Sequence, residues 1–177
     1  MAITWKAPSN VFELLENIKQ KDHHPRLESA KIAVAFNDAK PFTKDRLNLG
    51  STTKFTPFAK IWQKEIYDFC ILLCSDLWHQ ICDDTQRMAL LDLHLTRCQV
   101  EYVPETVVEG KKKKIVKDEW GRIQYTDQIK CDDDGNPKWY VAPLDLVVFS
   151  QNGRRYGMWY EDLASLADAL KLHGAAV

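Results

Sequence analysis

The segment from Asp83 to Cys98 constrains the fold more than any other part of the sequence. It contains neither glycine nor proline, and it opens with Asp83 and Asp84. An aspartate at this place can accept the free amide protons of a first helical turn, and acidic residues there favour the helix dipole. The pattern therefore predicts a helix over residues 84–98.

Apolar spacing predicts further elements ahead of this helix. Residues 9–20 begin with a capping serine and carry a helical apolar stripe, while residues 31–36 and 67–74 are short apolar runs typical of buried strands. Residues 37–60 favour a loop with one short strand. Residues 77–81 predict a brief helical turn.

Residues 100–141 differ from the segments before them. Short stretches in which apolar and polar residues alternate are separated there by residues that favour turns. Pro104, Gly110, Gly121 and the run 134–137 separate the alternating pieces. This pattern predicts β-hairpins. The acidic run 132–136 lacks the alternating oxygen ligands and the closing glutamate of a calcium-binding loop, so we interpret it as a hairpin turn.

The C-terminal part predicts a second strong helix. Residues 144–149 carry mixed helix and strand signals, Asn152 and Gly153 are expected to break the run, and residues 160–172 have a clean helical stripe. We therefore predict an α+β fold, in which a small mixed or antiparallel sheet combines the strands with the hairpins and helix 84–98 packs on one face.

The length, composition and charge of the chain limit the number of domains and the kind of surface that it can have. A chain of 177 residues with 45% apolar residues can bury a full core, so we expect one domain over residues 1–177. Its core should span about residues 30–172, with a helix and linker at 1–25 and a hairpin region at 104–141. A net charge of -1 argues against a surface that binds nucleic acid globally.

The sequence also bears on location and redox state. It has no run of about 20 apolar residues and no signal-like start, so we expect no membrane partner and a protein that stays in the cytoplasm. An odd number of cysteines in a chain of this size favours free thiols. The five are Cys70, Cys74, Cys82, Cys98 and Cys131.

Three stretches, in order, resemble the family of putative phage metallopeptidases, which are small zincin-like proteins of phages and prophages. The first is the strand at 68–71 with the residues that follow it to Arg87. The second, residues 89–98 (ALLDLHLTRC), is in frame with the family pattern A-L-L-D-H-E-L-C-H-C. The third runs from 144 to 149 and continues as Arg155-Tyr156-Gly157-Met158-Trp159. The resemblance covers roughly residues 30–165 and implies a zincin-like fold.

The positions that would bind zinc in that family carry other residues here. In H-E-x-x-H the two histidines lie four apart on one helix face and hold zinc, and the glutamate polarises the attacking water. The histidine positions are occupied by Leu93 and Arg97, the glutamate position by His94, and the downstream histidine position by Leu144. Leucine has no lone pair and arginine stays cationic, so the resemblance implies a degenerate site without a metal or other cofactor.

This degeneracy leads to three expectations about the former site. Leu93 and Leu144 should fill the former metal cavity in apolar contact. Arg97 should either reach solvent or pair with a carboxylate, for which Asp145 is the preferred partner and Asp92 the second choice. Restoring Leu93→His, His94→Glu, Arg97→His and Leu144→His together should create zinc affinity.

The resulting functional hypothesis is a catalytically inactive phage or prophage protein that binds a macromolecule of the host or of its defence system, with a protein as the expected partner. The alternative is a metal-dependent peptidase with displaced ligands. His94 and Cys98 are spaced i, i+4, and distant additional donors would be Cys74, His79 or Cys82. The adjacent pair His23 and His24 is expected to face solvent.

The expected binding surface lies in the hairpin region, where loops carry partner specificity. The candidate residues are Lys111, Lys112, Lys113, Lys114, Trp120, Arg122 and Trp139. A third hypothesis, nucleic-acid binding, would use the lysine run with Lys117 and Arg122. Deleting residues 109–120 should leave the fold intact and abolish binding.

Overall fold

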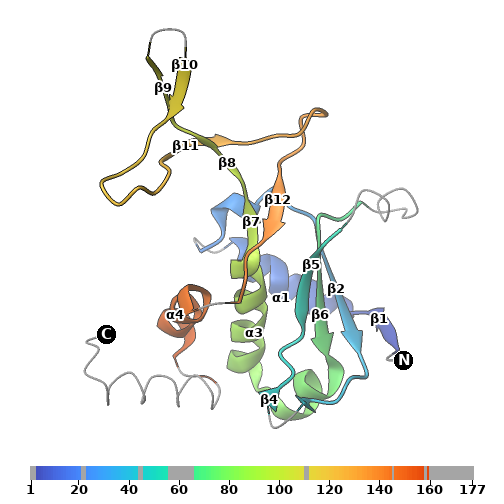
Figure 1. The fold of residues 1–177 in the computed structure, drawn as a ribbon. Coiled ribbons are helices and arrows are strands. Elements are labelled where there is room, and N and C mark those ends of the chain that lie inside the picture. Colours follow the sequence, from blue (N-terminus) through green and yellow to red (C-terminus); the bar gives the residue numbers. More distant parts are fainter. Residues whose placement is uncertain are drawn as a thin grey trace, which may run out of the picture. The chain divides into compact units, whose positions relative to one another are not determined.

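A computed structural model describes residues 3–20, 23–43, 46–55, 66–109, 112–144, 146–157 and 159. Contacts divide the chain into two compact units, the first formed by residues 1–98 with 141–177 and the second by residues 99–140. Figure 1 shows both with their elements labelled. The expectation of one domain stays a prediction, because a compact unit need not fold independently.

The first unit contains a four-stranded sheet with the strand order β1-β2-β6-β5. Its strands are β1 (Thr4–Lys6), β2 (Ile32–Asn37), β6 (Phe69–Cys74) and β5 (Ser51–Lys54). β2 and β6 are parallel, and the two outer strands are antiparallel to their neighbours. The strands predicted near 31–36 and 67–74 are thus confirmed as the centre of a mixed sheet.

One face of this sheet is buried. Burial alternates along β2 and β6, so that Ile32, Val34 and Phe36 lie on the same side as Phe69 and Ile71. Alternation of this kind follows from the two-residue period of a strand.

Glycine is required immediately before β5. Gly50 has a φ of 87°, and a Cβ atom at this position would overlap the carbonyl oxygen of Leu72. Any other residue would therefore push β5 away from β6 as well as strain its own backbone.

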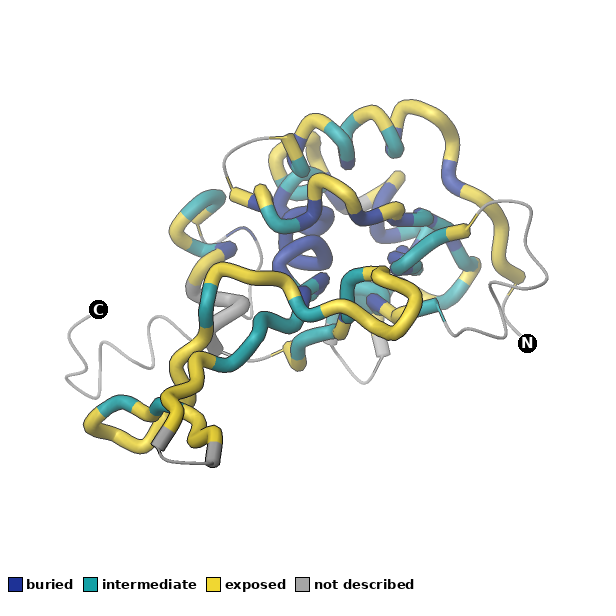
Figure 2. The backbone as a smooth tube through the Cα atoms, turned by 90° about the horizontal axis from the view of Figure 1, so that it is seen from above, coloured by how far each residue is buried: buried dark blue, intermediate teal, exposed yellow. Residues whose placement is uncertain are grey.

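Helix α3 (Asp84–Arg97) forms where the sequence predicted a helix. Asp83 forms a capping box with Gln86, in which its side chain accepts from the Gln86 amide and the Gln86 side chain accepts from the Asp83 amide. All residues from Ala89 to Thr96 are buried, and Figure 2 shows this stretch in dark blue. α3 contacts α1 and α4 as well as β5, so helices cover it in addition to the sheet on which it was expected to pack.

The shorter elements complete the unit. Helix α1 (Ser9–Gln20) has the predicted bounds and buries Val11, Leu15 and Ile18. The 3-10 helix η1 (Pro25–Leu27), the hairpin β3 (Phe42–Thr43) and β4 (Arg46–Leu47), and the π-helical turn η2 (Leu77–Ile81) connect the larger elements. In the part of the chain that is described, no helix is long and apolar enough to cross a membrane.

Helix α4 (Leu146–Tyr156) corrects one prediction, because it runs through Asn152 and Gly153 without a break. Asn152 is fully buried and its amide nitrogen donates to the carbonyl oxygen of Ala89 on α3. These tertiary hydrogen bonds offset the weak helix propensity of asparagine. The helix predicted at 160–172 lies outside the described residues.

The second unit confirms the predicted hairpins but not their place in the central sheet. Its strands pair two by two, β7 with β12, β8 with β11 and β9 with β10, and form sheets of their own. Their bounds are β7 (Cys98–Val100), β8 (Tyr102–Pro104), β9 (Thr106–Glu109), β10 (Lys112–Ile115), β11 (Tyr125–Ile129) and β12 (Trp139–Val141).

Two junctions organise this unit. At the first, Glu101, Lys130 and Lys138 are joined by backbone hydrogen bonds, and residues 131–137 leave as a side hairpin. At the second junction, backbone hydrogen bonds join Glu105, Val116 and Gln124 in the same way. The β9–β10 hairpin and the turn at 117–123 both begin and end at this junction. The β8–β11 ladder runs between the junctions. We call the three outgrowths the basic prong (106–115), the tryptophan prong (117–123) and the acidic prong (131–137).

Candidate functional site

The four positions that the resemblance assigns to the zinc site do not form a metal centre. Leu93 is buried and has no donor atom, whereas Leu144 is 43% exposed. The expected apolar contact between Leu93 and Leu144 inside a filled cavity is therefore wrong, because a side chain this exposed does not fill a buried space.

His94 is held by two hydrogen bonds to the protein itself. Its Nδ1 lies 2.8 Å from Thr52 Oγ1, and its Nε2 lies 2.7 Å from the carbonyl oxygen of Leu49. A carbonyl only accepts, so Nε2 carries the proton, and the lone pair of Nδ1 accepts from the threonine hydroxyl. Both ring nitrogens are thus engaged, and neither has a lone pair left for a metal ion.

The electrostatics of His94 agree with a neutral ring. Burial lowers the pKa of His94 to about 4, against the opposing effect of the Leu49 hydrogen bond, and the charge of Arg97 lowers it further. A neutral imidazole whose nitrogens are both occupied can act neither as a general base nor as a ligand. His94 instead ties α3 to the start of β5.

Cys98 does not complete a displaced site with His94. Its Sγ lies 3.5 Å from the carbonyl oxygen of His94, and burial raises the thiol pKa to about 12. Metal binding needs the thiolate. Among the more distant donors, Cys74 donates to the carbonyl oxygen of Ala39 and burial raises the pKa of Cys82 to about 11. Within the described ranges, no three His, Cys, Asp or Glu side chains are grouped to hold a metal.

Arg97 uses the backbone as its partner. Its Nε donates to the carbonyl oxygen of Ala142 at 3.1 Å. Its expected partner Asp145 lies outside the described residues, and Asp92 makes its contacts elsewhere. A cation at the position of the second histidine repels a metal ion, so a zinc ion does not fit this set of residues.

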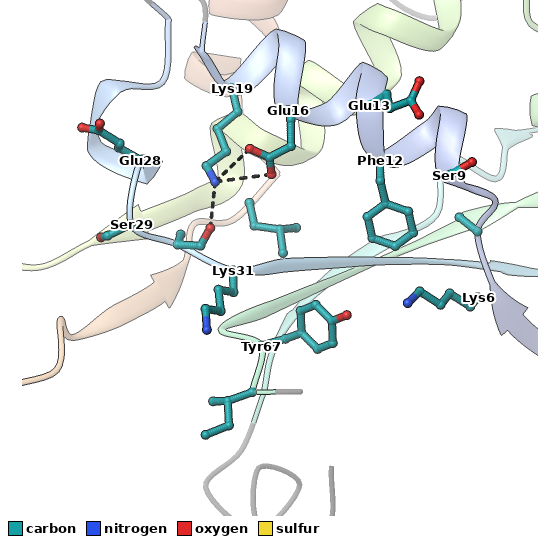
Figure 3. A pocket seen from close by; sticks show the side chains of 14 residues that line it. Lys6, Ser9, Phe12, Glu13, Glu16, Lys19, Glu28, Ser29, Lys31 and Tyr67 are labelled. Atoms are coloured by element: carbon teal, nitrogen blue, oxygen red, sulfur yellow. Dashed lines mark hydrogen bonds and ion pairs between the residues drawn. The ribbon is translucent and has the colours of Figure 1, made fainter. Parts of the chain in front are cut away.

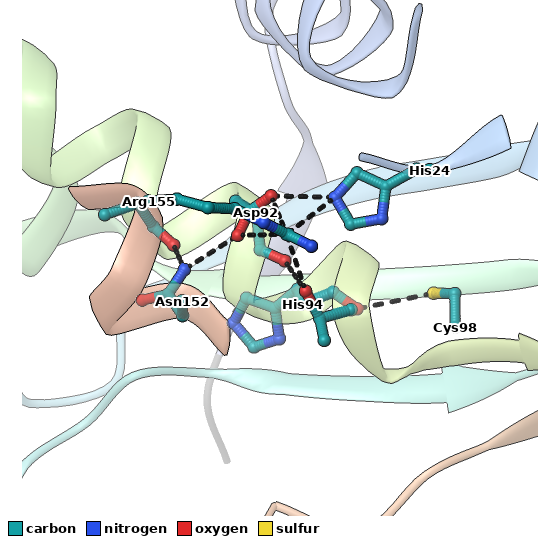
Figure 4. A network of polar contacts seen from close by, with 8 residues as sticks. His24, Asp92, His94, Cys98, Asn152 and Arg155 are labelled. Atoms are coloured by element: carbon teal, nitrogen blue, oxygen red, sulfur yellow. Dashed lines mark hydrogen bonds and ion pairs between the residues drawn. The ribbon is translucent and has the colours of Figure 1, made fainter. Parts of the chain in front are cut away.

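The polar centre of the first unit lies around Asp92 instead (Figure 4). His24 Nε2 lies 2.7 Å from Asp92 Oδ1, and Arg155 Nη1 lies 2.7 Å and 2.9 Å from the two carboxylate oxygens. The Asn152 amide donates to Asp92 Oδ2 at 2.9 Å. The network thus joins three segments that are distant in sequence, namely the loop after α1, α3 and α4.

Two further groups close this Asp92 network. The indole nitrogen of Trp159 donates to Asn152 Oδ1 at 2.5 Å, and Arg155 Nη1 lies 3.3 Å from Thr96 Oγ1. We define the Asp92 network by its members, His24, Asp92, Thr96, Asn152, Arg155 and Trp159. Asp92, Arg155 and Trp159 lie in the stretches that carry the family resemblance, and the network gives them a shared structural role.

Burial and charge fix the ionisation of the network. Burial alone raises the pKa of the Asp92 carboxyl, but the hydrogen bonds from His24 and Asn152 and the charges nearby outweigh it, so the pKa lies below its ordinary value. Burial lowers the pKa of His24 more than Asp92 raises it. The result is a neutral His24 beside an Asp92–Arg155 ion pair, with the buried His24 Nδ1 lacking a hydrogen-bond partner.

His24 corrects the expectation that the histidine pair faces solvent. His23 is exposed as expected, but His24 is fully buried. No pattern in the sequence pointed to His24, because its partners lie 68 and 131 residues away. The apolar Leu27 and Ala30 that follow are the only local sign that this loop returns to the core.

Some of the residues expected to form a binding surface in the second unit are exposed in the structure, and one is buried. Trp120 is 71% exposed, and the Arg122 guanidinium lies 4.7 Å from the centre of its ring. Lys113 and Lys114 are exposed on β10, while Lys111 and the Lys112 side chain lie outside the description. Trp139 is buried at 4% exposure, so its inclusion in a binding surface was wrong.

The turn of the tryptophan prong is closed by hydrogen bonds to Asp118. Asp118 Oδ1 accepts from the amides of Trp120 and Arg122, and Asp118 Oδ2 accepts from Arg122 Nε at 2.7 Å. The backbone of the turn and the Arg122 guanidinium are thereby held before any partner arrives, which reduces the entropy lost on binding.

A groove of about 990 Å³ lies between α1 and the start of β2 (Figure 3). Phe12 and Tyr67 line it, and Lys19 on its wall is bound by Glu16 and by the carbonyl oxygen of Ala30. The charged side chains that line it are of both signs. The groove is a surface hollow without an arrangement of acid, base or nucleophile among its described lining residues.

Comparison with known proteins gives one result. The family model described as putative phage metallopeptidase matches residues 3–171, which is nearly the whole chain. No curated protein and no solved structure matches the sequence significantly. The match extends beyond the stretches on which the resemblance rested, and the chain belongs to the putative phage metallopeptidase family.

Proposed function

We propose that this protein is a catalytically inactive member of its family, which acts by binding a macromolecule of the host or of its defence system. The observation that carries the proposal is the state of His94. At the position of the general base stands a neutral, buried ring whose two nitrogens bind Thr52 and Leu49.

The neighbouring positions support the same proposal. Metal-assisted hydrolysis needs ligands with free lone pairs, an open coordination position and a base for the attacking water. Leu93 supplies no lone pair, and Arg97 places a cation where a ligand would stand. The alternative peptidase with His94 and Cys98 as displaced ligands is disfavoured by the engaged imidazole and the neutral thiol.

The second unit offers the better surface for a partner. Exposed Trp and Arg side chains on a preorganised turn are typical of residues that dominate binding energy, and Trp120 with Arg122 has this arrangement. A protein partner is favoured over nucleic acid, because residues 99–140 carry eight Lys and Arg against nine Asp and Glu. Phosphate binding needs a basic excess.

Metal analysis tests the loss of catalysis. The protein produced in zinc-supplemented medium should contain far less than one equivalent of zinc, and it should not cleave unfolded protein substrates. One equivalent of zinc that a chelator removes together with a peptidase activity would overturn the proposal.

A restored site provides the matched comparison. The variant with Leu93→His, His94→Glu, Arg97→His and Leu144→His should bind zinc in equilibrium dialysis, whereas each single variant should not. Because Leu144 is exposed, its histidine has to move inward, and weak binding is expected. A folded quadruple variant without zinc affinity would contradict the assignment of these positions.

Affinity capture from host lysate tests the binding surface. The pair Trp120→Ala and Arg122→Ala should lose a partner that the wild type retains, and Gln128→Ala, an exposed residue on β11, is the control. If capture instead weakens steeply with salt and disappears after nuclease treatment, the partner is nucleic acid.

A further inference from the structure

Strand pairing around the second junction fixes which of its side chains share a face. Three pairs of opposite residues surround the junction, namely Pro104 with Tyr125, Thr106 with Ile115, and Lys117 with Ile123. Opposite residues of an antiparallel pair point to the same face, and so do residues two apart along a strand. Neighbouring pairs are linked by such two-residue steps, so all six side chains lie on one face. We call it the junction face, and Val108 with its opposite residue Lys113 extends it along the basic prong.

The junction face is rich in exposed apolar side chains. Four large ones on it are between 38% and 64% exposed, namely Val108, Ile115, Ile123 and Tyr125. On the opposite face, by contrast, Val103 and Val116 next to the junction are half-buried. Single exposed apolar residues are ordinary, but a group of them on one face marks an interaction surface.

The charges near the junction are segregated between its two faces. The junction face carries Lys113 and Lys117, both exposed, and its described side chains between these two lysines and Tyr125 include no carboxylate. Glu105 and Asp118 are each adjacent in sequence to residues of the junction face, so their carboxylates belong to the opposite face. Asp127 lies in the stretch where the β8–β11 register shifts, and the junction face ends there.

From this arrangement we infer that the junction face binds an acidic protein segment that brings apolar side chains of its own. The apolar side chains of the face form the centre of this interface. Lys113 and Lys117, on either side of Ile115, pair with carboxylates of the partner. Arg122, which stacks on Trp120, is bound to Asp118 on the opposite face, so the inference does not rest on the proposed function.

Charge and side-chain type favour this occupant over the others. A second copy placed face to face would bring lysines against lysines, and a basic surface would be repelled in the same way. Single-stranded nucleic acid stacks its bases on aromatic rings, whereas three of the four exposed apolar side chains are aliphatic. An acidic protein segment with apolar residues suits both the lysines and the aliphatic side chains.

Selection from a displayed library of random peptides on the immobilised full-length protein tests the chemistry of the partner. The enriched peptides should carry more Asp and Glu than Lys and Arg, and they should contain apolar residues. Their synthetic forms should bind the protein in fluorescence anisotropy, and more weakly at high salt. Enrichment of neutral or basic peptides, or no enrichment at all, would overturn the inference.

Two adjacent valines of β9 provide a matched test of the face. Val108→Asp changes the junction face and Val107→Asp changes the opposite one, and both residues are exposed in the wild type. Val108→Asp should weaken binding of the acidic peptides roughly tenfold or more, and Val107→Asp less than about threefold. Circular dichroism checks that both variants are folded. Equal weakening by the two variants would contradict binding at this face.

The lysines are tested at constant net charge. Lys113→Gln with Lys117→Gln removes both charges of the junction face and should weaken peptide binding roughly tenfold. Lys114→Gln with Gln124→Glu, both on the opposite face, lowers the net charge by the same amount and should leave binding nearly unchanged. If both double variants lose the same affinity, the attraction is long-range and the contacts inferred here are wrong.

Four further results would assign the face or the peptide differently and overturn the inference. A dimer that Val108→Asp dissociates would make a second copy the occupant. Binding of single-stranded oligonucleotides that the Lys113 and Lys117 variant loses would make it nucleic acid. Binding of phosphatidylcholine vesicles containing phosphatidylserine that Val108→Asp loses would make it a membrane. Peptide binding that is lost only with Trp120→Ala and Arg122→Ala would place the peptide on the tryptophan prong.

Discussion

Arg155 Nη1 lies within 2.9 Å of both carboxylate oxygens of Asp92, although the two residues are 63 positions apart in the sequence. This ion pair joins α4 to α3 inside the first unit, where Asp92 is fully buried and the Arg155 side chain is 19% exposed. A buried carboxylate needs its partners, because an uncompensated charge in the interior is costly. The ion pair is therefore a structural link, and its removal should lower the free energy of unfolding.

Replacing Arg155 by methionine should lower the free energy of unfolding by about 3 kcal/mol, because it leaves the Asp92 carboxylate buried with neutral partners. Urea unfolding monitored by tryptophan fluorescence measures the change. Arg154→Met is the matched control, since Arg154 is the exposed neighbour on the same helix. Equal stability of both variants would show that the ion pair contributes nothing.

Thr52→Val should cost about 1–3 kcal/mol of stability, since it keeps the side-chain shape but leaves His94 Nδ1 buried without a donor. The adjacent Thr53, exposed on the same strand, supplies the control Thr53→Val. Thermal unfolding of the three proteins gives the comparison. A drop of similar size in both variants would point to strand propensity and not to the His94 contact.

Acid should destabilise the protein between the ordinary histidine pKa of 6.5 and about 4. The folded-state pKa values of His24 and His94 lie below 6.5, so the unfolded chain takes up protons first as the pH falls. His94 alone accounts for roughly 3 kcal/mol once the pH is below its folded pKa. The lowered pKa of Asp92 adds a loss in the same direction below its ordinary value of 3.8.

The test of this acid lability is the free energy of unfolding measured over that range in the wild type and in His94→Gln. The glutamine variant is expected to be less stable at neutral pH but to have a shallower slope with pH. Parallel curves for the two proteins would mean that His94 does not titrate on unfolding.

Replacing residues 106–115 by Asn-Gly should leave the rest of the second unit folded. The Val116 amide donates to the Glu105 carbonyl oxygen at 2.9 Å, so the chain ends at the basic prong are already adjacent, and Asn-Gly favours a two-residue hairpin turn. Deleting 109–120 instead would remove Trp120 and break the second junction at Val116. Amide hydrogen exchange of residues 124–141 should be unchanged in the Asn-Gly variant and accelerated in the longer deletion.

Local patterns in the sequence predicted the fold well and its polar centre poorly. The caps at Ser9 and Asp83 and the apolar runs of the two central strands are signals within a few residues, and the helices and strands formed there. In the Asp92 network, by contrast, Asn152 and His24 bind Asp92 from 60 and 68 positions away in the sequence. Propensity marked Asn152 as a helix breaker because it does not include the tertiary hydrogen bonds that hold it.

For the candidate site, too, the sequence predicted the features that depend on residue type and missed those that depend on packing. Residue type alone was enough to see that Leu93 and Arg97 cannot hold zinc. The state of His94 could not be seen, because Thr52 and the Leu49 carbonyl reach it from a different part of the chain. The exposure of Leu144 and the burial of Trp139 likewise depend on packing that alternation patterns do not record.

Gly50 lies between the Leu49 carbonyl that binds His94 and the strand that carries Thr52, and its backbone admits no side chain. In a saturation-mutagenesis experiment on this protein, substitutions at position 50 should therefore be tolerated as poorly as substitutions of a catalytic residue in an active enzyme. Intolerance at this position follows from the backbone conformation that a packed helix and strand require. The constraint on Gly50 beside α3 is therefore a sign of architecture and carries no information about turnover.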